Sequence, residues 1–266
     1  MRRVLVVVFA AAVCAVVIRV SAQQGQRSAG SAATQSPKRA WFAVNVVTIK
    51  RGSDTAWRDF QKTQTIPMQQ KGGVKQRDTW QSGAPFGDGA TYAIVTPIEK
   101  FEDYDKPQLA ARTLSGEALR AYQEKNASLT VSNHMFAVQD RAELSVAPAS
   151  MAKIRGAILT DLTVLPGHAP QYEAYVKNDL LPVLKKGNVG GYSVSVTIFG
   201  GKAGEYHAVQ YFESYGEIDK GPIPTRVLGQ TGAQALNAKL FPHIAEANRT
   251  ILRYVPELSY SRRPTT

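Results

Sequence analysis

Apolar and polar residues follow two distinct spacings through the second half of the chain. An apolar, β-branched run over 154–165 predicts a strand, and Pro166-Gly167-His168 predicts the turn after it. Residues 169–186 carry apolar side chains three or four positions apart, as on one face of a helix, and Pro182 within this helix predicts a kink or a new helical turn. The pattern then predicts, in order, a strand over 191–199, a turn over 200–204, a strand over 206–213, a helix over 231–247 and a strand over 249–255.

The same landmarks occur about 115 residues earlier in the chain. Thr48-Ile49-Lys50-Arg51-Gly52 aligns with residues 163–167, and the same offset aligns Trp57 with Tyr172. Further landmarks align at this offset or at one residue less: Phe60 with Tyr175, Ile66-Pro67 with Leu181-Pro182, Tyr92 with Tyr206, and Glu143-Leu144-Ser145 with Glu257-Leu258-Ser259. Matches spread this widely indicate an internal repeat.

Each repeat has the order βαββαβ, which is that of the ferredoxin-like split βαβ unit. A four-stranded antiparallel sheet with helices on one face leaves its other face bare, and two copies in one chain can bury those faces against each other. We therefore predict an α+β fold. Two tandem ferredoxin-like repeats, residues 40–150 and 151–260, are expected to form one intrachain dimeric α/β-barrel.

The two ends of the chain do not belong to this pattern. Two arginines and an apolar run open the sequence, and small residues end at Ala22, which is typical of a signal peptide over residues 1–22. The apolar run is shorter than the roughly 20 residues that cross a bilayer, although an uncleaved anchor is the alternative. Residues 23–39 are predicted to be a flexible linker and residues 261–266 a tail. We expect a bacterial protein that is exported, periplasmic or secreted, without a transmembrane segment after cleavage.

Charge and cysteine content exclude several classes of function. The full sequence has a formal net charge of +11, but its basic residues occur in scattered pairs, without the focused stripe that nucleic acids require, so no nucleic-acid partner is expected. The single cysteine, Cys14, lies within the predicted signal peptide. Disulfides, thiolate catalysis and cysteine-bound metals are therefore excluded from the mature protein.

The duplicated βαββαβ pattern, with residues 163–167 before an amphipathic helix, resembles the dimeric α/β-barrel superfamily, in particular its NIPSNAP-like and antibiotic-biosynthesis-monooxygenase-like groups. The resemblance covers about residues 40–260 and is topological. The superfamily includes cofactor-free monooxygenases, haem-degrading enzymes and proteins with no known activity, so the resemblance implies a fold and leaves the chemistry open. Because the monooxygenase and haem-degrading relatives use an asparagine and a tryptophan in their pockets, it also implies Asn45 and Trp80 as candidate catalytic residues.

Two further candidates come from the strands themselves. His207 lies in the third strand of the second repeat, and it can serve as a general base or a haem ligand if it faces the barrel lumen. The alternative is a histidine that is hydrogen-bonded at a sheet edge. Asp161 interrupts an otherwise apolar strand, and it faces either outward at an edge or into a wet lumen.

The strand predicted over 75–81 is unusually polar. A strand with one buried apolar face should not place Arg77, Thr79 and Gln81 on the same side. Either this strand lies at an exposed edge, or these side chains line a polar cavity. Arg77 and Gln81, together with Tyr211 beside His207, are therefore the candidate ligand-binding residues.

The remaining histidines do not indicate a metal centre. His168 follows a glycine in a strand-to-helix turn and is expected to lie in the N-terminal cap of the helix. We assign no metal to His134 or His243. No cofactor is predicted, with haem as the alternative. The sequence contains no Gly-x-Ser-x-Gly elbow and no phosphate-binding loop, so nothing in it indicates a hydrolase.

Two functions remain open. The first is a barrel protein of unassigned activity that binds a small-molecule ligand or a partner. The second is a cofactor-independent monooxygenase or haem-binding enzyme that uses the barrel lumen. A lumen of mixed polarity with His207 or Asn45 inside favours the enzyme, whereas a lumen packed with apolar side chains favours the binding protein. The sequence leaves open whether the protein is a monomer or a homo-oligomer.

Overall fold

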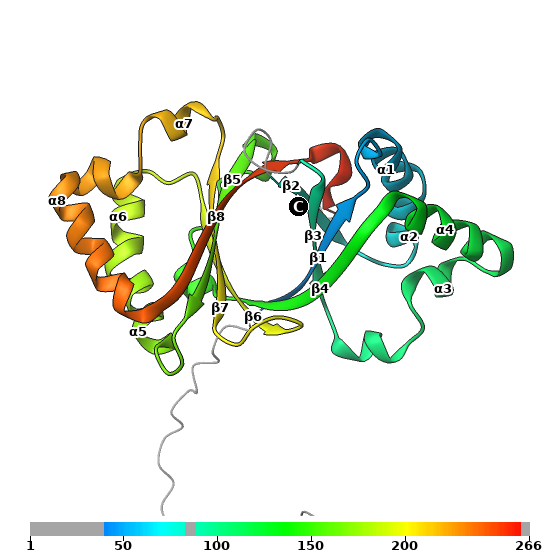
Figure 1. The fold of residues 1–266 in the computed structure, drawn as a ribbon, viewed down its shortest axis with the longest axis horizontal. Coiled ribbons are helices and arrows are strands. Elements are labelled where there is room, and N and C mark those ends of the chain that lie inside the picture. Colours follow the sequence, from blue (N-terminus) through cyan, green and yellow to red (C-terminus); the bar gives the residue numbers. More distant parts are fainter. Residues whose placement is uncertain (1–39, 83–88, 262–266) are drawn as a thin grey trace, which may run out of the picture. The chain divides into compact units, whose positions relative to one another are not determined.

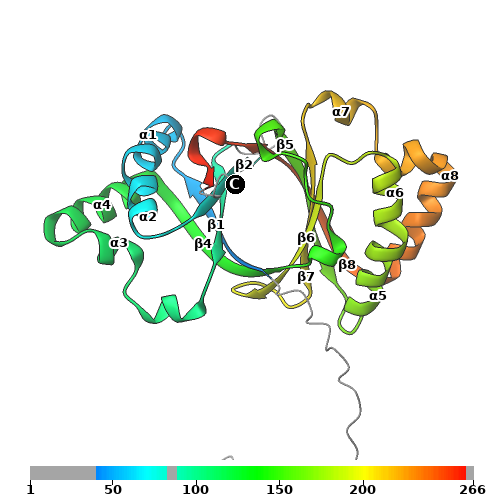
Figure 2. The ribbon, with the colours of Figure 1, turned by 180° about the vertical axis from the view of Figure 1, so that it is seen from behind.

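In the part of the chain that the structure describes, residues 40–82 and 89–261, eight strands pair into one closed antiparallel barrel (Figure 1). The structure is a computed structural model. Its helices lie on two opposite sides of the barrel, as the view from behind also shows (Figure 2). The predicted signal peptide, the linker up to residue 39 and residues 262–266 lie outside the described ranges, so these stay predictions.

The two halves of the barrel contain strands and helices in a similar order. Residues 40–150 contain β1 (Trp41–Ile49), α1 (Asp54–Phe60), α2 (Ile66–Lys71), β2 (Gln76–Ser82), β3 (Thr91–Ile98), α3 (Leu109–Thr113), α4 (Gly116–Leu129) and β4 (Thr130–Asp140). Residues 151–261 contain β5 (Gly156–Val164), α5 (Ala169–Tyr175), α6 (Leu181–Lys186), β6 (Tyr192–Phe199), β7 (Glu205–Phe212), α7 (Gly216–Asp219), α8 (Ile223–Leu240), β8 (Ile244–Tyr254) and β9 (Tyr260–Ser261). The mixed α/β barrel is thereby confirmed, and the tandem duplication stays a prediction.

Two seams close the barrel. The first half contributes strands in the order β4-β1-β3-β2, and the second half contributes them in the order β8-β5-β7-β6. At one seam β4 pairs with β6, and at the other β2 pairs with β8. The short β9 adds a pairing at the beginning of β2. Because both seams are backbone hydrogen-bond ladders, each of the eight strands has a neighbour on both sides.

Each strand presents alternate residues to two different compartments. Successive side chains of a strand point to opposite faces of the sheet. In β5, Leu162 and Val164 belong to the apolar cluster under the helices, whereas Ala157 and Leu159 belong to a separate cluster with Trp80 and other residues of the opposite face. The outer face of the sheet is therefore covered by helices, and the inner face lines the lumen of the barrel.

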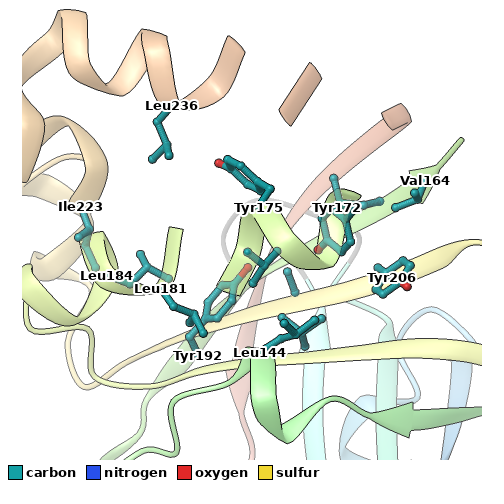
Figure 3. Packing of buried hydrophobic residues seen from close by; sticks show 14 residues of the cluster. Leu144, Val164, Tyr172, Tyr175, Leu181, Leu184, Tyr192, Tyr206, Ile223 and Leu236 are labelled. Carbon is teal, nitrogen blue, oxygen red and sulfur yellow. The ribbon is translucent and has the colours of Figure 1, made fainter. Parts of the chain in front are cut away.

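The helices of the second half pack on the barrel through aromatic and aliphatic side chains. Tyr172 of α5 packs against Tyr206 of β7, with ring centroids 4.6 Å apart, and Leu184 of α6 and Leu236 of α8 belong to the same apolar cluster (Figure 3). These four side chains are at most 6% exposed. Full burial of one such side chain stabilises a fold by about 1.5–3 kcal/mol, so this layer supplies much of the driving force for folding.

A π-helical turn lies within the first helical segment of each half. Residues Gln61–Thr65 separate α1 from α2, and residues Val176–Leu180 separate α5 from α6. Each π turn comes just before a proline, Pro67 or Pro182, which has no N–H to donate to a carbonyl of the preceding turn. The new helical turn expected at Pro182 is thus observed, as a change of helix type.

The sequence pattern misplaced the last helix of the second half. This helix was expected over 231–247, but α8 ends at Leu240 and a 3₁₀ turn through Pro242 follows it. Residues 244–247 instead pair with β5, with Ile244 opposite Val164. The prediction was wrong because this pairing partner lies about 80 residues away in the sequence, beyond the reach of local periodicity.

Charged side chains also link the two halves. Arg58 of α1 donates to Glu257, which follows β8, at 2.7 Å. At the corresponding place in the second half, Arg141, which follows β4, donates to both carboxylate oxygens of Glu173 of α5. The first helix of each half therefore binds the segment after the last strand of the other half.

Among the described residues, no helix combines the length and the apolar character that crossing a membrane requires.

The seams predict that neither half folds properly alone. Expressing residues 40–150 and 151–261 separately exposes the edges of β2, β4, β6 and β8, and exposed edges pair with other chains. We expect the halves to aggregate or self-dimerise, and the intact protein to unfold in a single cooperative transition. Size-exclusion chromatography with light scattering, together with thermal unfolding, measures this. Two monomeric halves as stable as the whole would contradict the prediction.

Candidate functional site

The lumen contains a hydrogen-bonded row of three polar side chains from three adjacent strands. Asp161 of β5 and His207 of β7 lie opposite each other in the antiparallel register. The Nδ1 atom of His207 is 2.7 Å from Oδ1 of Asp161, and its Nε2 atom is 2.7 Å from the hydroxyl of Thr197 in β6. The third strand of a split βαβ unit lies beside the first, so this fold brings together residues that are 46 positions apart in the sequence.

These contacts orient the imidazole. A carboxylate accepts only, so Nδ1 of His207 carries a hydrogen and donates it to Asp161. In the neutral imidazole, Nε2 then has the lone pair and accepts the hydrogen of the Thr197 hydroxyl. The side chain of His207 is 13% exposed and that of Asp161 is 36% exposed, so the pair is reachable from solvent. In its neutral form, a histidine oriented in this way has the geometry of a general base at Nε2, provided that a ligand replaces the Thr197 hydroxyl there.

Aromatic rings from β4 flank the imidazole. The ring of Phe136 lies 5.3 Å from the ring of His207, centroid to centroid, and His134 lies 5.8 Å beyond Phe136. In the first half, the positions that match Asp161 and His207 are apolar, because Val46 of β1 lies opposite Ala93 of β3. The acid–base pair therefore occurs on the second-half side of the lumen.

Beside this polar row, the lumen is lined by aromatic rings whose hydroxyl groups bond to polar side chains. Trp80 of β2 lies 4.8 Å from the ring of Tyr254 and 5.8 Å from that of Tyr211, and all three belong to the lumen cluster. The Tyr211 hydroxyl bonds to Ser193 at 3.0 Å, and the Tyr254 hydroxyl donates to Asp78 at 3.2 Å. Burial raises the pKa of both phenols above the ordinary value, so both stay protonated at neutral pH. The lumen thus has mixed polarity.

The structure decides between the alternatives for His207 and Asp161. Neither lies at a sheet edge, because β5 pairs with β7 and β8, and β7 pairs with β5 and β6. Both side chains face the lumen. Trp80 and Tyr211 also face the lumen. Tyr211 lies in β7, four residues after His207. Four of the seven candidate residues therefore share one compartment.

Asn45 does not share it. In β1, Asn45 has the same side-chain direction as Val47, which packs under the helices, and it lies opposite Ile94 of that same cluster. Its Oδ1 atom is buried without a hydrogen-bond partner in the described structure. The role in a lumen pocket that the resemblance implied for Asn45 is therefore wrong in position, because alternation places its neighbours Val44 and Val46 inside instead.

Arg77 is buried on the helix-covered face of β2. It is 0% exposed and donates to three uncharged acceptors, namely Thr79, Gln69 and Gln61, at 2.8–3.1 Å. Burial lowers the pKa of its guanidinium to about 10, which still leaves it charged at neutral pH. Both interpretations of this strand were wrong for Arg77, since β2 pairs on both sides and Arg77 points away from the lumen.

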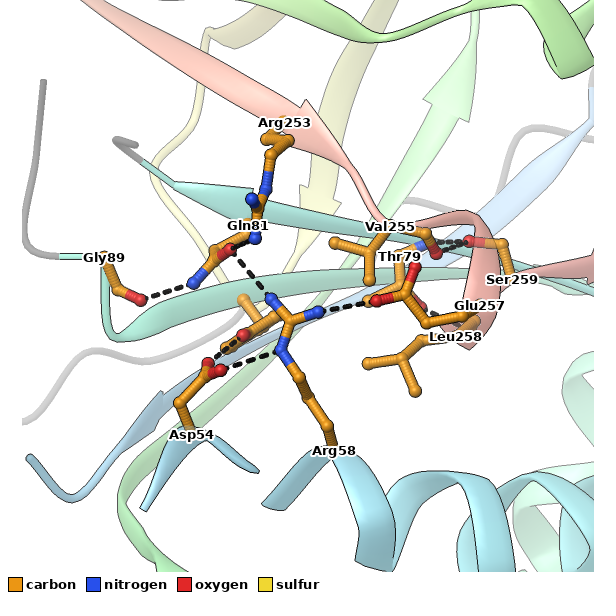
Figure 4. Close-up of polar contacts among 11 residues, drawn as sticks. Asp54, Arg58, Thr79, Gln81, Gly89, Arg253, Val255, Glu257, Leu258 and Ser259 are labelled. Atoms are coloured by element: carbon orange, nitrogen blue, oxygen red, sulfur yellow. Dashed lines mark hydrogen bonds and ion pairs between the residues drawn. The ribbon is translucent and has the colours of Figure 1, made fainter. Parts of the chain in front are cut away.

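Gln81 belongs to a polar network at the seam between the halves (Figure 4). Its Oε1 atom accepts from Arg58 of α1 and from Arg253 of β8, and its Nε2 atom donates to the carbonyl of Gly89. Arg58 also binds Asp54 and Glu257 in the same view. Every polar atom of the Gln81 amide is thus engaged within the protein, which argues for a role in joining α1 to the seam.

His168 and His243 lie apart from the lumen row. His168 occupies the N-cap position of α5 as expected, but its side chain makes no capping hydrogen bond and contacts His243 instead. Across the described ranges, no three or more His, Cys, Asp or Glu side chains form a group that could hold a metal ion.

Two hollows open elsewhere on the described surface. One, of about 460 Å³, lies between the π turn of the first half and α4, beside Gln64 and Tyr122. The other, of about 330 Å³, lies under the segment Phe101–Asp105, beside Phe101, Phe136 and Phe199. Neither is lined by His207 or Asp161, so the site is defined by the row of polar side chains in the lumen.

The sequence analysis missed Thr197 and Ser193, although a signal was present. The strand over 191–199 alternates apolar residues with Ser193, Ser195 and Thr197. This alternation was used only to predict a strand, and its polar side was not assigned to the lumen. In a closed barrel the polar side faces the lumen, so the three hydroxyl groups line the same compartment as His207.

Comparison with known proteins identifies the fold. The sequence matches no protein-family model, and it matches no curated protein. Among solved structures, a putative monooxygenase from Lactobacillus acidophilus NCFM aligns with a TM-score of 0.55 at 8% identity, over 85% of this chain and 97% of the other. A putative monooxygenase from Fusobacterium nucleatum aligns with a TM-score of 0.53 at 11% identity, over 81% and 92% of the two chains. An anthrone oxidase-like protein aligns with a TM-score of 0.52 at 13% identity, over 86% and 96%.

These alignments cover almost all of each neighbouring chain. The chain therefore has the fold of the dimeric α/β-barrel proteins, with both barrel halves in one polypeptide. At identities of 8–13% the likeness establishes the fold alone.

The network around Arg77 generates a stability prediction. Arg77→Leu leaves the buried side-chain oxygen of Gln61 without a donor, which costs about 1–3 kcal/mol, and it removes the donor of the half-buried Gln69 as well. The corresponding place in the second half is filled by Val176, Leu184 and Tyr192. The triple variant Gln61→Val, Gln69→Leu, Arg77→Tyr should therefore recover most of the stability lost in the single variant. Urea unfolding measures the free energy of unfolding of both variants. A triple variant less stable than Arg77→Leu would contradict the prediction, because it would show that apolar side chains cannot replace the network at this place.

Proposed function

We propose that the protein is a cofactor-independent monooxygenase that binds a small organic ligand in the barrel lumen and removes a proton from it with His207. The observation that carries this proposal is the inward-facing imidazole of His207, oriented by Asp161 at 2.7 Å. A lumen of mixed polarity with this histidine inside supports the enzyme over a barrel that only binds.

Asp161 orients the base and stabilises its charged form. When Nε2 takes a proton, His207 becomes an imidazolium, and the carboxylate 2.7 Å from Nδ1 favours that charge. The ligand must replace the Thr197 hydroxyl at Nε2, and that hydroxyl can then rotate toward the ligand. Asp161 is thus a positioning residue, and His207 is the residue that meets the substrate.

The lining favours a ligand with a flat apolar part. Trp80, Tyr211 and Tyr254 supply ring surfaces, and Val209 and Leu159 supply aliphatic ones beside the acid–base pair. A C–H group next to a carbonyl or aromatic system is acidic enough for an imidazole base when the resulting anion is delocalised. Such an anion can reduce molecular oxygen, so that a CH₂ group and O₂ become a carbonyl group and water. This balance needs no external reductant, and it agrees with the names of the neighbouring structures.

The proposal extends to origin and location. The similar order of elements, the matching π turns and the reciprocal links Arg58–Glu257 and Glu173–Arg141 support a tandem duplication of one ferredoxin-like unit. Residues 1–22 of the sequence support export. The NIPSNAP-like and monooxygenase-like groups share this architecture, and the lumen base favours the monooxygenase-like group.

The enzymatic proposal is tested with anthrone as the probe and oxygen consumption as the measurement. His207→Gln should lower turnover by about 10²–10⁴-fold, the usual contribution of a positioned general base. Asp161→Asn should lower turnover while leaving KM nearly unchanged, because it disturbs the orientation of His207 and touches no substrate. Binding of the probe, measured by quenching of the tryptophan fluorescence, should change little in either variant.

His134→Gln is the matched control, since His134 is an exposed histidine on β4 without a carboxylate partner in the described contacts. It should retain full activity. Oxygen consumption that survives His207→Gln would exclude His207 as the base. If the unaltered protein binds the probe but consumes no oxygen, the enzymatic proposal is contradicted and the lumen is a binding site only.

Haem fits this lumen less well than an organic ligand. A haem ligand would have to be Nε2 of His207, which is bonded to Thr197 at 2.7 Å, with the ring packed against Phe136. We therefore expect that adding haem to the purified protein gives no Soret shift. A shift that His207→Ala removes would contradict this expectation and make the protein a haem protein.

A further inference from the structure

A pair of histidines lies outside the lumen, where α8 ends and α5 begins (Figure 1). His168 occupies the N-cap position of α5, and His243 ends the 3₁₀ turn before β8. Their Nδ1 atoms are 3.0 Å apart, and both side chains are part-buried. The mechanism proposed above does not use either residue.

Backbone hydrogen bonds fix the positions of both residues. The N–H of Leu165 donates to the carbonyl of His243 at 2.9 Å, and the N–H of His168 donates to the carbonyl of Leu165 at 3.0 Å. Gly167, with φ of +81°, lies in the turn from Leu165 to His168. These backbone hydrogen bonds therefore hold the turn of His168 and the 3₁₀ turn of His243 against each other.

The fold does not need the imidazoles at this place. In the first half, the N–H of Lys50 donates to the carbonyl of Leu129 at 2.9 Å, and the N–H of Ser53 donates to the carbonyl of Lys50 at 3.0 Å. Gly52 has the same φ of +81°. The same turn thus forms with a serine and a leucine where the second half has two histidines. The histidine pair is an addition to a turn that is stable without it.

We propose that His168 and His243 form a binding site for a divalent transition-metal ion. Imidazole nitrogens bind Zn²⁺ at about 2.0–2.1 Å, so two of them on one ion lie roughly 2.8–3.4 Å apart for bond angles between a right angle and a tetrahedral one. The two Nδ1 atoms already have this separation. A small rotation of the rings turns both lone pairs toward one ion, without a change in the backbone.

The chemistry of the pair selects the ion. Neutral imidazole suits Zn²⁺, Ni²⁺ and Cu²⁺, and among these Cu²⁺ binds most tightly to a given set of nitrogen ligands. Two protein ligands leave further coordination positions to water, so the ion is exchangeable and open to another ligand. Binding requires both nitrogens without protons, so the ion replaces the single hydrogen that the pair otherwise shares, and binding weakens as the pH falls.

The test is titration of the intact purified protein with Cu²⁺, Ni²⁺ and Zn²⁺ at pH 7.5. Isothermal titration calorimetry measures the binding, and thermal unfolding measures its effect on stability. We expect one ion per chain at this site and a rise in the unfolding temperature. His168→Ser and His243→Leu each introduce the residue that the first half carries in the same turn. Either variant should fold normally and should lose the calorimetric signal and the temperature rise.

Two controls make the result specific. His207→Gln and His134→Gln remove the histidines of the lumen side, and both should bind Cu²⁺ as the unaltered protein does. The electron paramagnetic resonance spectrum of the Cu²⁺ complex, which needs no variant, should show coupling to two nitrogen ligands. Absence of binding for all three ions overturns the proposal, as does binding that persists in His168→Ser and His243→Leu. In either case the pair is a hydrogen-bonded histidine contact only.

Discussion

The structure depends on the closure of its sheet at two seams, between β4 and β6 and between β2 and β8. An antiparallel sheet of four strands has two open edges, and here each edge is paired with an edge of the other half. Closure turns one face of the sheet into an interior, so the fold has two interiors, one under the helices and one in the lumen. The reciprocal ion pairs of Arg58 and Arg141 lie at these same junctions, and they add charge pairing to the backbone ladders.

The sequence was sufficient to predict the architecture because its strongest signals are local and occur twice. Strand alternation, helix spacing and the glycine turns recur about 115 residues apart, and a sheet with a bare face has few ways to bury it in a single chain. The candidate residues His207 and Asp161 were found in the same way, as polar interruptions of apolar strands. Their partnership was not predicted, because it depends on the register between β5 and β7, which is set by tertiary contacts.

The errors in assigning strand residues to a face share one physical cause. Alternation shows which residues of a strand lie on the same face, but it does not show which face is covered by helices. In most half-buried strands the polar face meets solvent, so the polar residues of β6 were not considered as site residues, although Thr197 faces the lumen. In β2 the covered face is itself polar, so Arg77 and Gln81 suggested a cavity where the structure has a buried network. Asn45 was misplaced by the same uncertainty.

The separation into two interiors has a consequence for how such a protein can change over evolutionary time. Leu162 and Asp161 are neighbours in the chain, yet one packs under α5 and the other lines the lumen. Substitution at lumen positions therefore alters recognition and reactivity while leaving the helix-packed core intact, and the reverse holds for core positions. A chain with two such halves gains further freedom, because one half can carry Asp161 and His207 where the other has Val46 and Ala93. Asymmetric chemistry thus becomes accessible to a scaffold whose backbone is nearly symmetric.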